Sequence, residues 1–374
     1  MIRGLIPFVA LVATLLLAAP ATARDREREA AVEALERAEA LAKGRGVRSG
    51  RELSPALAAL AARRSDLGRF ERREADALLA RPTENPDPTV PPNLGLQPYQ
   101  SATTSDDTDH FRVHWVESTS DNDAPPGANN NTSDTPAYIT GLKAALEKAF
   151  EVENGALGWR TPVSDGTRGG NARTDVYVKD IGDKGLFGYA APDPGQTGRS
   201  RFAYMVMDDD YSEFGAADPQ DPLEVTAAHE YNHVLQYAYD TFQDTWMFES
   251  TATWIEERVF DDVNDYLFYL GPWADRPSQP LTYAGDGAPP SGDDLKIYGS
   301  AIWNHWLDSR YGPAVVRQAW AVSQASGGGY APGAYDRAIR DMGGVPLGGR
   351  GREVLELGRE AGAYDRAIRD MGGP

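Results

Sequence analysis

Apolar and polar residues alternate at the start of the stretch HFRVHWVES, and this alternation predicts a half-buried strand. Phe111, Val113 and Trp115 would form its buried face. The other face carries His110 and His114, which could bind a metal but are expected to face solvent. The sheet of the protein is therefore expected to begin with this strand.

A helix and two further strands are expected before residue 210. Apolar residues recur at helical spacing over residues 137–150, after a loop rich in Asp, Thr and Pro. Residues 175–181 and 202–207 have the composition of buried strands, and the second (FAYMVM) could be an edge strand on which an extended substrate pairs. This order predicts an α+β domain with an N-terminal mixed sheet.

From residue 223 onward the pattern becomes helical. Segments with helical spacing cover residues 223–239, 246–260, 262–270, 298–311 and 314–324. They predict a helical lobe that follows the sheet, so the main domain is expected to span residues 109–345.

Residues 24–82 are rich in Ala, Arg, Glu and Leu, a composition that favours helices. Breaks are expected near residues 44–50 and at Ser54-Pro55. Two interpretations remain open: an amphipathic helical pair packed on the main domain, or a propeptide that masks an active site during export. The Pro-rich residues 83–108 predict an extended linker between this segment and the main domain.

Both ends of the chain are expected to lie outside the main domain. Arg3, an apolar run of about 15 residues and the motif Ala21-Thr22-Ala23 are typical of a secretory signal peptide over residues 1–23. The run is shorter than the roughly 20 residues of a membrane-spanning helix. We therefore expect a secreted or periplasmic protein without stable membrane insertion. The sequence GAYDRAIRDMGG occurs at 333–344 and again at 362–373, and residues 346–374 are expected to form a tail.

Composition limits the chemistry that the chain can perform. None of its 374 residues is cysteine, so a transition metal would need His, Asp or Glu ligands. The net charge of −19 is concentrated after residue 82 and disfavours binding to nucleic acid or anionic lipid. Asp208, Asp209 and Asp210 could bind Ca²⁺ through hard oxygen ligands, although an acidic turn without an ion is the simpler interpretation.

The most informative stretch is HEYNH, which begins at His229 and fits the pattern H-E-x-x-H. Four residues turn a helix by about 400°, so His229 and His233 project from nearly one face and could bind one Zn²⁺. Glu230, one position further round, could take a proton from a metal-bound water. The alternative is a helix whose histidines only form hydrogen bonds.

A catalytic zinc needs a third protein ligand. The extension H-E-x-x-H-x-x-G-x-x-H is absent, because Gln236 and Tyr239 occupy its last two defined positions. The remaining candidates are Asp240, Asp244, Glu249, Glu256, Glu257 and His305. Glu249 is favoured, because it lies in a strongly apolar predicted helix where an unpaired carboxylate is costly. Glu256, two turns along that helix, could orient a ligating histidine.

The motif HEYNH followed by Glu249 in WMFESTATW resembles the gluzincin zinc peptidases, which include the thermolysin-like and aminopeptidase families. The sequence looks most like a group of secreted bacterial metallopeptidases, and the likeness extends more weakly over about residues 105–345. The resemblance implies a zincin-like catalytic domain. It also implies that His229, His233 and Glu249 are zinc ligands and that Glu230 is the general base.

Two departures from those families stand out. Thr253 occupies the position where the thermolysin-like families have Asp, and the GxMEN signature of the aminopeptidases is absent, which favours an endopeptidase. In related enzymes a Tyr or His from a downstream helix stabilises the oxyanion, which makes Tyr298 and His305 candidates.

The sequence therefore predicts a secreted zinc endopeptidase that acts on a peptide or protein substrate. One alternative is a non-catalytic secreted protein with a structural zinc site, and another is an acidic calcium-binding surface protein. The presence of Glu230 favours catalysis, because a structural site needs the histidines but not a base.

Overall fold

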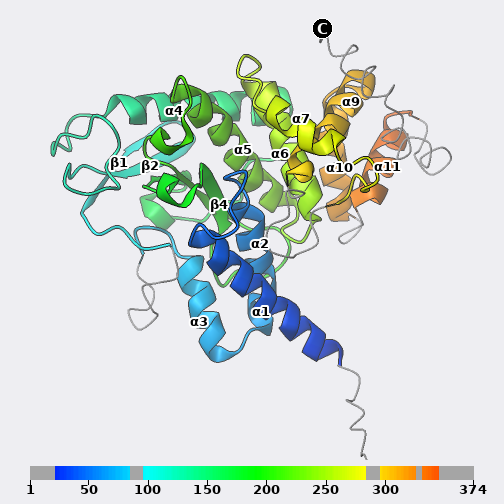
Figure 1. The fold of residues 1–374 in the computed structure, drawn as a ribbon, viewed down its shortest axis with the longest axis horizontal. Coiled ribbons are helices and arrows are strands. Elements are labelled where there is room, and N and C mark those ends of the chain that lie inside the picture. Colours follow the sequence, from blue (N-terminus) through cyan, green and yellow to red (C-terminus); the bar gives the residue numbers. More distant parts are fainter. Residues whose placement is uncertain (1–21, 85–95, 284–294, 326–330, 345–374) are drawn as a thin grey trace, which may run out of the picture.

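The computed structural model describes residues 22–84, 96–283, 295–325 and 331–344. In these residues a mixed five-stranded sheet and a set of helices form an α+β fold (Figure 1). The predicted signal peptide, except its last two residues, lies outside the described residues, as do all of the predicted tail and the second copy of the repeat. The first copy of the repeat lies largely in α11.

The sheet has the strand order β1-β2-β3-β5-β4. The strands are β1 (Thr103–Asp107), β2 (Phe111–Val116), β3 (Thr174–Val178), β4 (Gly188–Pro192) and β5 (Ala203–Met207). β2, β3 and β5 are parallel, whereas β1 and β4 pair antiparallel at the two edges. The prediction that FAYMVM forms an edge strand is wrong, because β5 pairs with a neighbour on each side. The edge strand on this side of the sheet is β4.

Helices α4 (Ala137–Phe150) and α5 (Gln220–Tyr239) cover one face of the sheet. Phe111, Val113 and Trp115 lie in this core, as their alternation predicted. The helical lobe continues with α6 (Thr245–Val259), α7 (Leu267–Ala274), α8 (Lys296–Gly299), α9 (Ala301–Tyr311), α10 (Ala314–Ala325) and α11 (Ala331–Asp341). Shorter helical turns are η1 (Arg64–Asp66), η2 (Glu151–Ala156), η3 (Arg168–Gly170), η4 (Gly182–Lys184) and η5 (Ser212–Phe214). No helix among the described residues is long and apolar enough to cross a membrane.

The N-terminal segment, residues 22–84, lies against the opposite face of the sheet (Figure 1, blue). It contains three helices rather than the expected pair: α1 (Ala23–Ala42), α2 (Leu53–Arg63) and α3 (Arg69–Leu78). The break expected at Ser54-Pro55 is absent, because proline is tolerated in the first turn of a helix, where its missing N–H needs no partner. Leucines of the three helices pack on Tyr177, Tyr189 and Tyr204 of the sheet.

This packing buries His114. The prediction that His114 faces solvent is therefore wrong. Its Nε2 lies 2.7 Å from Asp175 Oδ1, and its ring stacks on Tyr177 with centroids 4.5 Å apart. Arg81 lies near the end of the N-terminal segment. Its Nη1 is 2.5 Å from Asp175 Oδ2, and its Nε is 2.8 Å from Asp193 Oδ1. The alternating pattern of β2 predicted that one face of the strand is exposed. Residues 22–84 cover that face, and a pattern within the strand cannot reveal a cover formed by a distant segment.

Candidate metal centre

Helices α5 and α6 lie side by side and bring three candidate ligands to one point. His229 Nε2 lies 3.3 Å from Glu249 Oε2, and His233 Nε2 lies 3.5 Å from Glu249 Oε1. Ligand atoms around a tetrahedral metal with bonds of about 2.0–2.1 Å are about 3.3–3.4 Å apart. All three side chains are buried. This trio can therefore hold a metal ion.

Each histidine is fixed through the ring nitrogen that faces away from Glu249. His229 Nδ1 lies 2.6 Å from Glu256 Oε1, and His233 Nδ1 lies 2.7 Å from Gln236 Oε1. With oxygen acceptors at both Nδ1 atoms, the proton of each ring is placed there and the lone pair of Nε2 is directed at Glu249. Neither Nε2 has a hydrogen-bond partner among the described residues.

Burial shifts the pKa values of these groups in the direction that favours their neutral forms. It lowers the pKa of His229 well below its usual value and that of His233 to about 4, so both rings are neutral, as metal ligands must be. It raises the pKa of Glu249 well above its usual value. Both Glu249 oxygens lack a hydrogen-bond partner among the described residues. A bound cation would compensate for this burial, and two imidazoles with one carboxylate form a donor set that suits zinc.

Glu230 lies between the metal ligands and the edge of the sheet. Its Oε2 accepts a hydrogen bond from Ser54 Oγ at 2.7 Å, whereas its Oε1 has no partner among the described residues. Burial raises the pKa of Glu230 to about 7. Gly188 of β4 permits the close approach, because a Cβ there would lie 2.7 Å from Thr226 Cγ2 and 3.2 Å from Glu230 Cγ.

Residues of the N-terminal segment also reach this centre, and sequence reasoning assigned none of them to it. Arg51 is 1% exposed and its Nη1 lies 3.4 Å from Glu256 Oε1. Glu52 is close enough to raise the pKa of Glu249 further. Ser54 bonds to Glu230 across 176 positions of sequence. No local pattern could have revealed such contacts, because they depend on how the segment packs.

The two candidate oxyanion donors are placed differently. Tyr298 is buried, and its ring centroid lies 6.4 Å from that of His229, at the margin of the metal centre. Burial raises the pKa of Tyr298 well above its usual value, so its hydroxyl keeps the proton. His305 instead packs on Tyr266, with centroids 4.8 Å apart, and burial lowers its pKa to about 4.

Three of the other carboxylates considered as third ligand, Asp240, Asp244 and Glu257, do not join the trio. Asp240 forms an ion pair with Arg199 at 2.7 Å. Asp244 is the N-cap residue of α6. Glu257 is partly exposed, and burial together with the charge of Asp261 raises its pKa to about 7.

The acidic turn after β5 also gathers carboxylates. Asp180, Asp208 and Asp209 lie within reach of one cation. Asp208, however, accepts hydrogen bonds from the backbone N–H groups of Gly182 at 2.5 Å and Tyr211 at 2.8 Å. Its oxygens therefore stabilise the turn.

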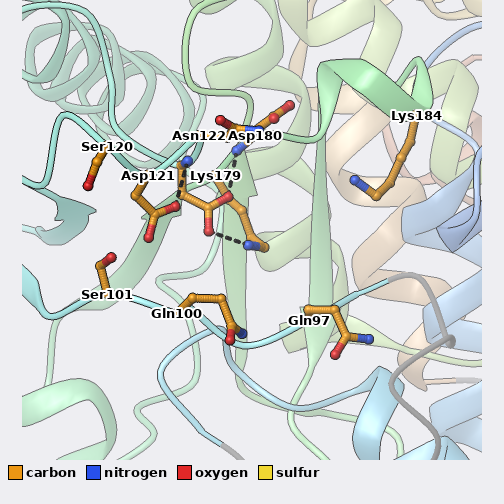
Figure 2. Close-up of a pocket in the computed structure, with 10 residues that line it drawn as sticks. Gln97, Gln100, Ser101, Ser120, Asp121, Asn122, Lys179, Asp180 and Lys184 are labelled. Carbon is orange, nitrogen blue, oxygen red and sulfur yellow. Dashed lines mark hydrogen bonds and ion pairs between the residues drawn. The ribbon is translucent and has the colours of Figure 1, made fainter.

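A polar pocket lies at the carboxyl ends of β2 and β3 (Figure 2). Lys179 Nζ lies 2.5 Å from Asp123 Oδ2, and the backbone N–H of Asp180 donates to the same carboxylate. None of the residues that line this pocket belongs to the metal centre, so the two are separate.

Comparison with known proteins yields no assignment for this chain. No family model matches it, and no curated protein matches it. Its function is therefore argued from the arrangement of its own residues.

Proposed function

We propose that the chain is a secreted zinc-dependent endopeptidase of the gluzincin type, with a zincin-like domain over residues 109–345. One observation carries the proposal: the inward atoms of His229, His233 and Glu249 converge without hydrogen-bond partners among the described residues, next to the carboxylate of Glu230. Secretion rests on the signal-peptide pattern of residues 1–23.

The residues divide the chemistry of hydrolysis between them. Zinc, when bound, would polarise a carbonyl and lower the pKa of a water ligand to about 7. The free Oε1 of Glu230 is suited to accept a proton near neutral pH and to pass it to the leaving amine, because its pKa is about 7. His229 and His233 hold the metal as neutral ligands, oriented by Glu256 and Gln236.

An extended peptide is the substrate class that suits the surroundings of the centre. β4 is an edge strand next to Glu230, and the N–H of Ala190 on it donates to Ser54 Oγ. A peptide backbone could accept this hydrogen bond in place of Ser54. Tyr298, with its proton retained, is our candidate for donating a hydrogen bond to the oxyanion.

A second candidate function is a structural zinc site in a non-catalytic protein. The observation that favours it is burial: the three ligands and Glu230 are each at most 1% exposed. A structural site explains the trio but gives Glu230 no role. A calcium-binding surface protein has weaker support, because Asp208 is already engaged by backbone N–H groups.

Replacement of Glu230 by Gln in the zinc-loaded chain tests the proposal. Hydrolysis of a quenched fluorescent peptide library is measured with and without 1,10-phenanthroline. It is measured on the intact chain and after a site-specific protease has cut a recognition sequence inserted in the Pro-rich linker. Wild-type turnover should need zinc, and Glu230→Gln should keep zinc but lose turnover by about 10²–10⁴-fold.

Glu224→Gln is the matched control, because Glu224 lies on the same helix but is partly exposed. It should retain both zinc and turnover. Equal turnover of Glu230→Gln and wild type would refute the mechanism. Bound zinc without hydrolysis in any form of the chain would favour the structural site.

A further inference from the structure

The N-terminal segment covers the centre on which a substrate would have to bind. Glu230 is 0% exposed and Glu249 is 1% exposed. Residues 49–54 precede α2 and form its first turn, and they reach this centre at two points. Ser54 bonds to Glu230, and Arg51 pairs with Glu256, the carboxylate that contacts His229. The burial of the centre therefore comes in part from this stretch.

Ser54 forms hydrogen bonds with two groups that an extended peptide substrate would contact, the Glu230 carboxylate and the Ala190 N–H. Its Oγ donates to Glu230 Oε2 at 2.7 Å and accepts the backbone N–H of Ala190 on β4 at 2.8 Å. Its carbonyl oxygen accepts a hydrogen bond from Tyr237 Oη at 3.2 Å. A substrate could not pair with Ala190 or approach Glu230 while Ser54 is in this position.

The loop before α2 also bonds to the backbone directly before β4. Phe187, which precedes β4, donates its backbone N–H to Gly50 O at 3.0 Å. Gly50 has a φ of +80°, and a Cβ there would lie 2.3 Å from the Phe187 ring, so only glycine fits this close approach. Helix α2 then packs along β4 (Figure 1).

Arg51 fastens this stretch to the helix that carries the third ligand. Its Nη1 lies 3.4 Å from Glu256 Oε1 and 3.0 Å from Asp265 Oδ2, and it donates to Tyr269 Oη at 2.7 Å. Removal of either partner would leave a buried charge unpaired, so the contact is specific to this position of the segment.

We propose that the N-terminal segment is autoinhibitory: residues 49–54 occupy the substrate position along β4, and the centre meets a substrate only when the segment is displaced or cut away. The inference rests on the proposed peptidase function. Its basis is that the segment engages the reacting carboxylate Glu230 and the edge N–H of Ala190, beyond the apolar packing that a structural layer needs.

The first test loosens the contact within the full zinc-loaded chain. The double variant Arg51→Met/Ser54→Ala is compared with Arg63→Met/Ser65→Ala, whose exposed side chains lie on the same segment away from the centre. Two rates are measured: removal of zinc by excess chelator, and hydrolysis of the peptide library. Both should rise by at least about tenfold in the first variant only, because the open population increases. The equilibrium zinc affinity is measured in parallel, so that faster removal at unchanged affinity reports access.

The second test uses wild type cut in the linker, and it decides whenever the double variant is unfolded or unchanged. In the cut chain, with both parts present and the fold confirmed by circular dichroism, both rates should rise, and an excess of the purified segment should lower them. Equal rates in the intact and cut chains would overturn autoinhibition. Faster zinc removal without any peptide hydrolysis would support the statement that the segment covers the metal centre, but it would refute the proposed peptidase activity.

Discussion

Two regions of this chain gather possible metal ligands, and they differ in what their polar atoms already bind. In the metal centre, the inward atoms of His229, His233 and Glu249 have no hydrogen-bond partner among the described residues. In the acidic turn, both oxygens of Asp208 accept backbone N–H groups. In the metal centre, hydrogen bonds hold the histidine atoms that point away from the metal position, and the atoms that point toward it have no such partner among the described residues. In the acidic turn, the carboxylate of Asp208 accepts hydrogen bonds from the surrounding backbone.

The largest expected difference between the two regions is in zinc affinity. Glu249→Ala should weaken zinc binding by more than about 100-fold, because loss of a ligand should exceed the 10–100-fold cost typical of losing a group that orients one. Glu257→Ala on the same helix should bind zinc like wild type. Competition with a chromophoric chelator measures both, and full zinc affinity in Glu249→Ala would remove this residue from the ligand set.

A smaller effect is expected for the acidic turn, and it concerns stability. Asp208→Ala should lower the free energy of unfolding by about 2–3 kcal/mol, because buried N–H groups of Gly182 and Tyr211 lose a carboxylate acceptor. Zinc affinity should stay unchanged. Denaturant unfolding combined with the chelator assay checks both statements, and a loss of zinc without a loss of stability would contradict the distinction between the two regions.

The smallest effect concerns the pH dependence of stability at Asp209. Burial, with the charges of Asp208 and Asp210, raises the pKa of Asp209 from 3.8 to about 8. A raised pKa means that the folded chain binds more protons than the unfolded chain, so this group destabilises the fold increasingly as the pH rises from about 4 to about 8. Asp209→Asn should therefore gain stability relative to wild type over this range, as followed by thermal unfolding.

If the acidic turn binds Ca²⁺, the ion reverses the difference in stability between wild type and Asp209→Asn. A Ca²⁺ ion would hold the carboxylate ionised, and millimolar Ca²⁺ would then stabilise wild type but not Asp209→Asn. We expect no such difference, and observing one would make the acidic turn a cation site.

The parts of the site that the sequence predicted share a local origin. His229, Glu230 and His233 follow from helical spacing, and Glu249 follows from the apolar surroundings of a single carboxylate in the next helix. The structure brings the three predicted ligands together.

The strands show where such reasoning ends. β2, β3 and β5 carry strongly apolar side chains and were predicted, whereas β1 (TTSDD) and β4 (GYAAP) have polar or small residues and were not. The roles of Arg51 and Ser54 were also missed, because their partners Glu256 and Glu230 are about 200 positions away and meet them only through tertiary packing.

The most direct test of the metal centre is X-ray absorption at the zinc edge on the zinc-loaded full chain. Our account predicts one zinc per chain, with two imidazole nitrogens from His229 and His233 at about 2.0–2.1 Å and carboxylate oxygen from Glu249 in its first shell. A first shell made only of oxygen, or two imidazole nitrogens that persist in His233→Ala, would contradict it.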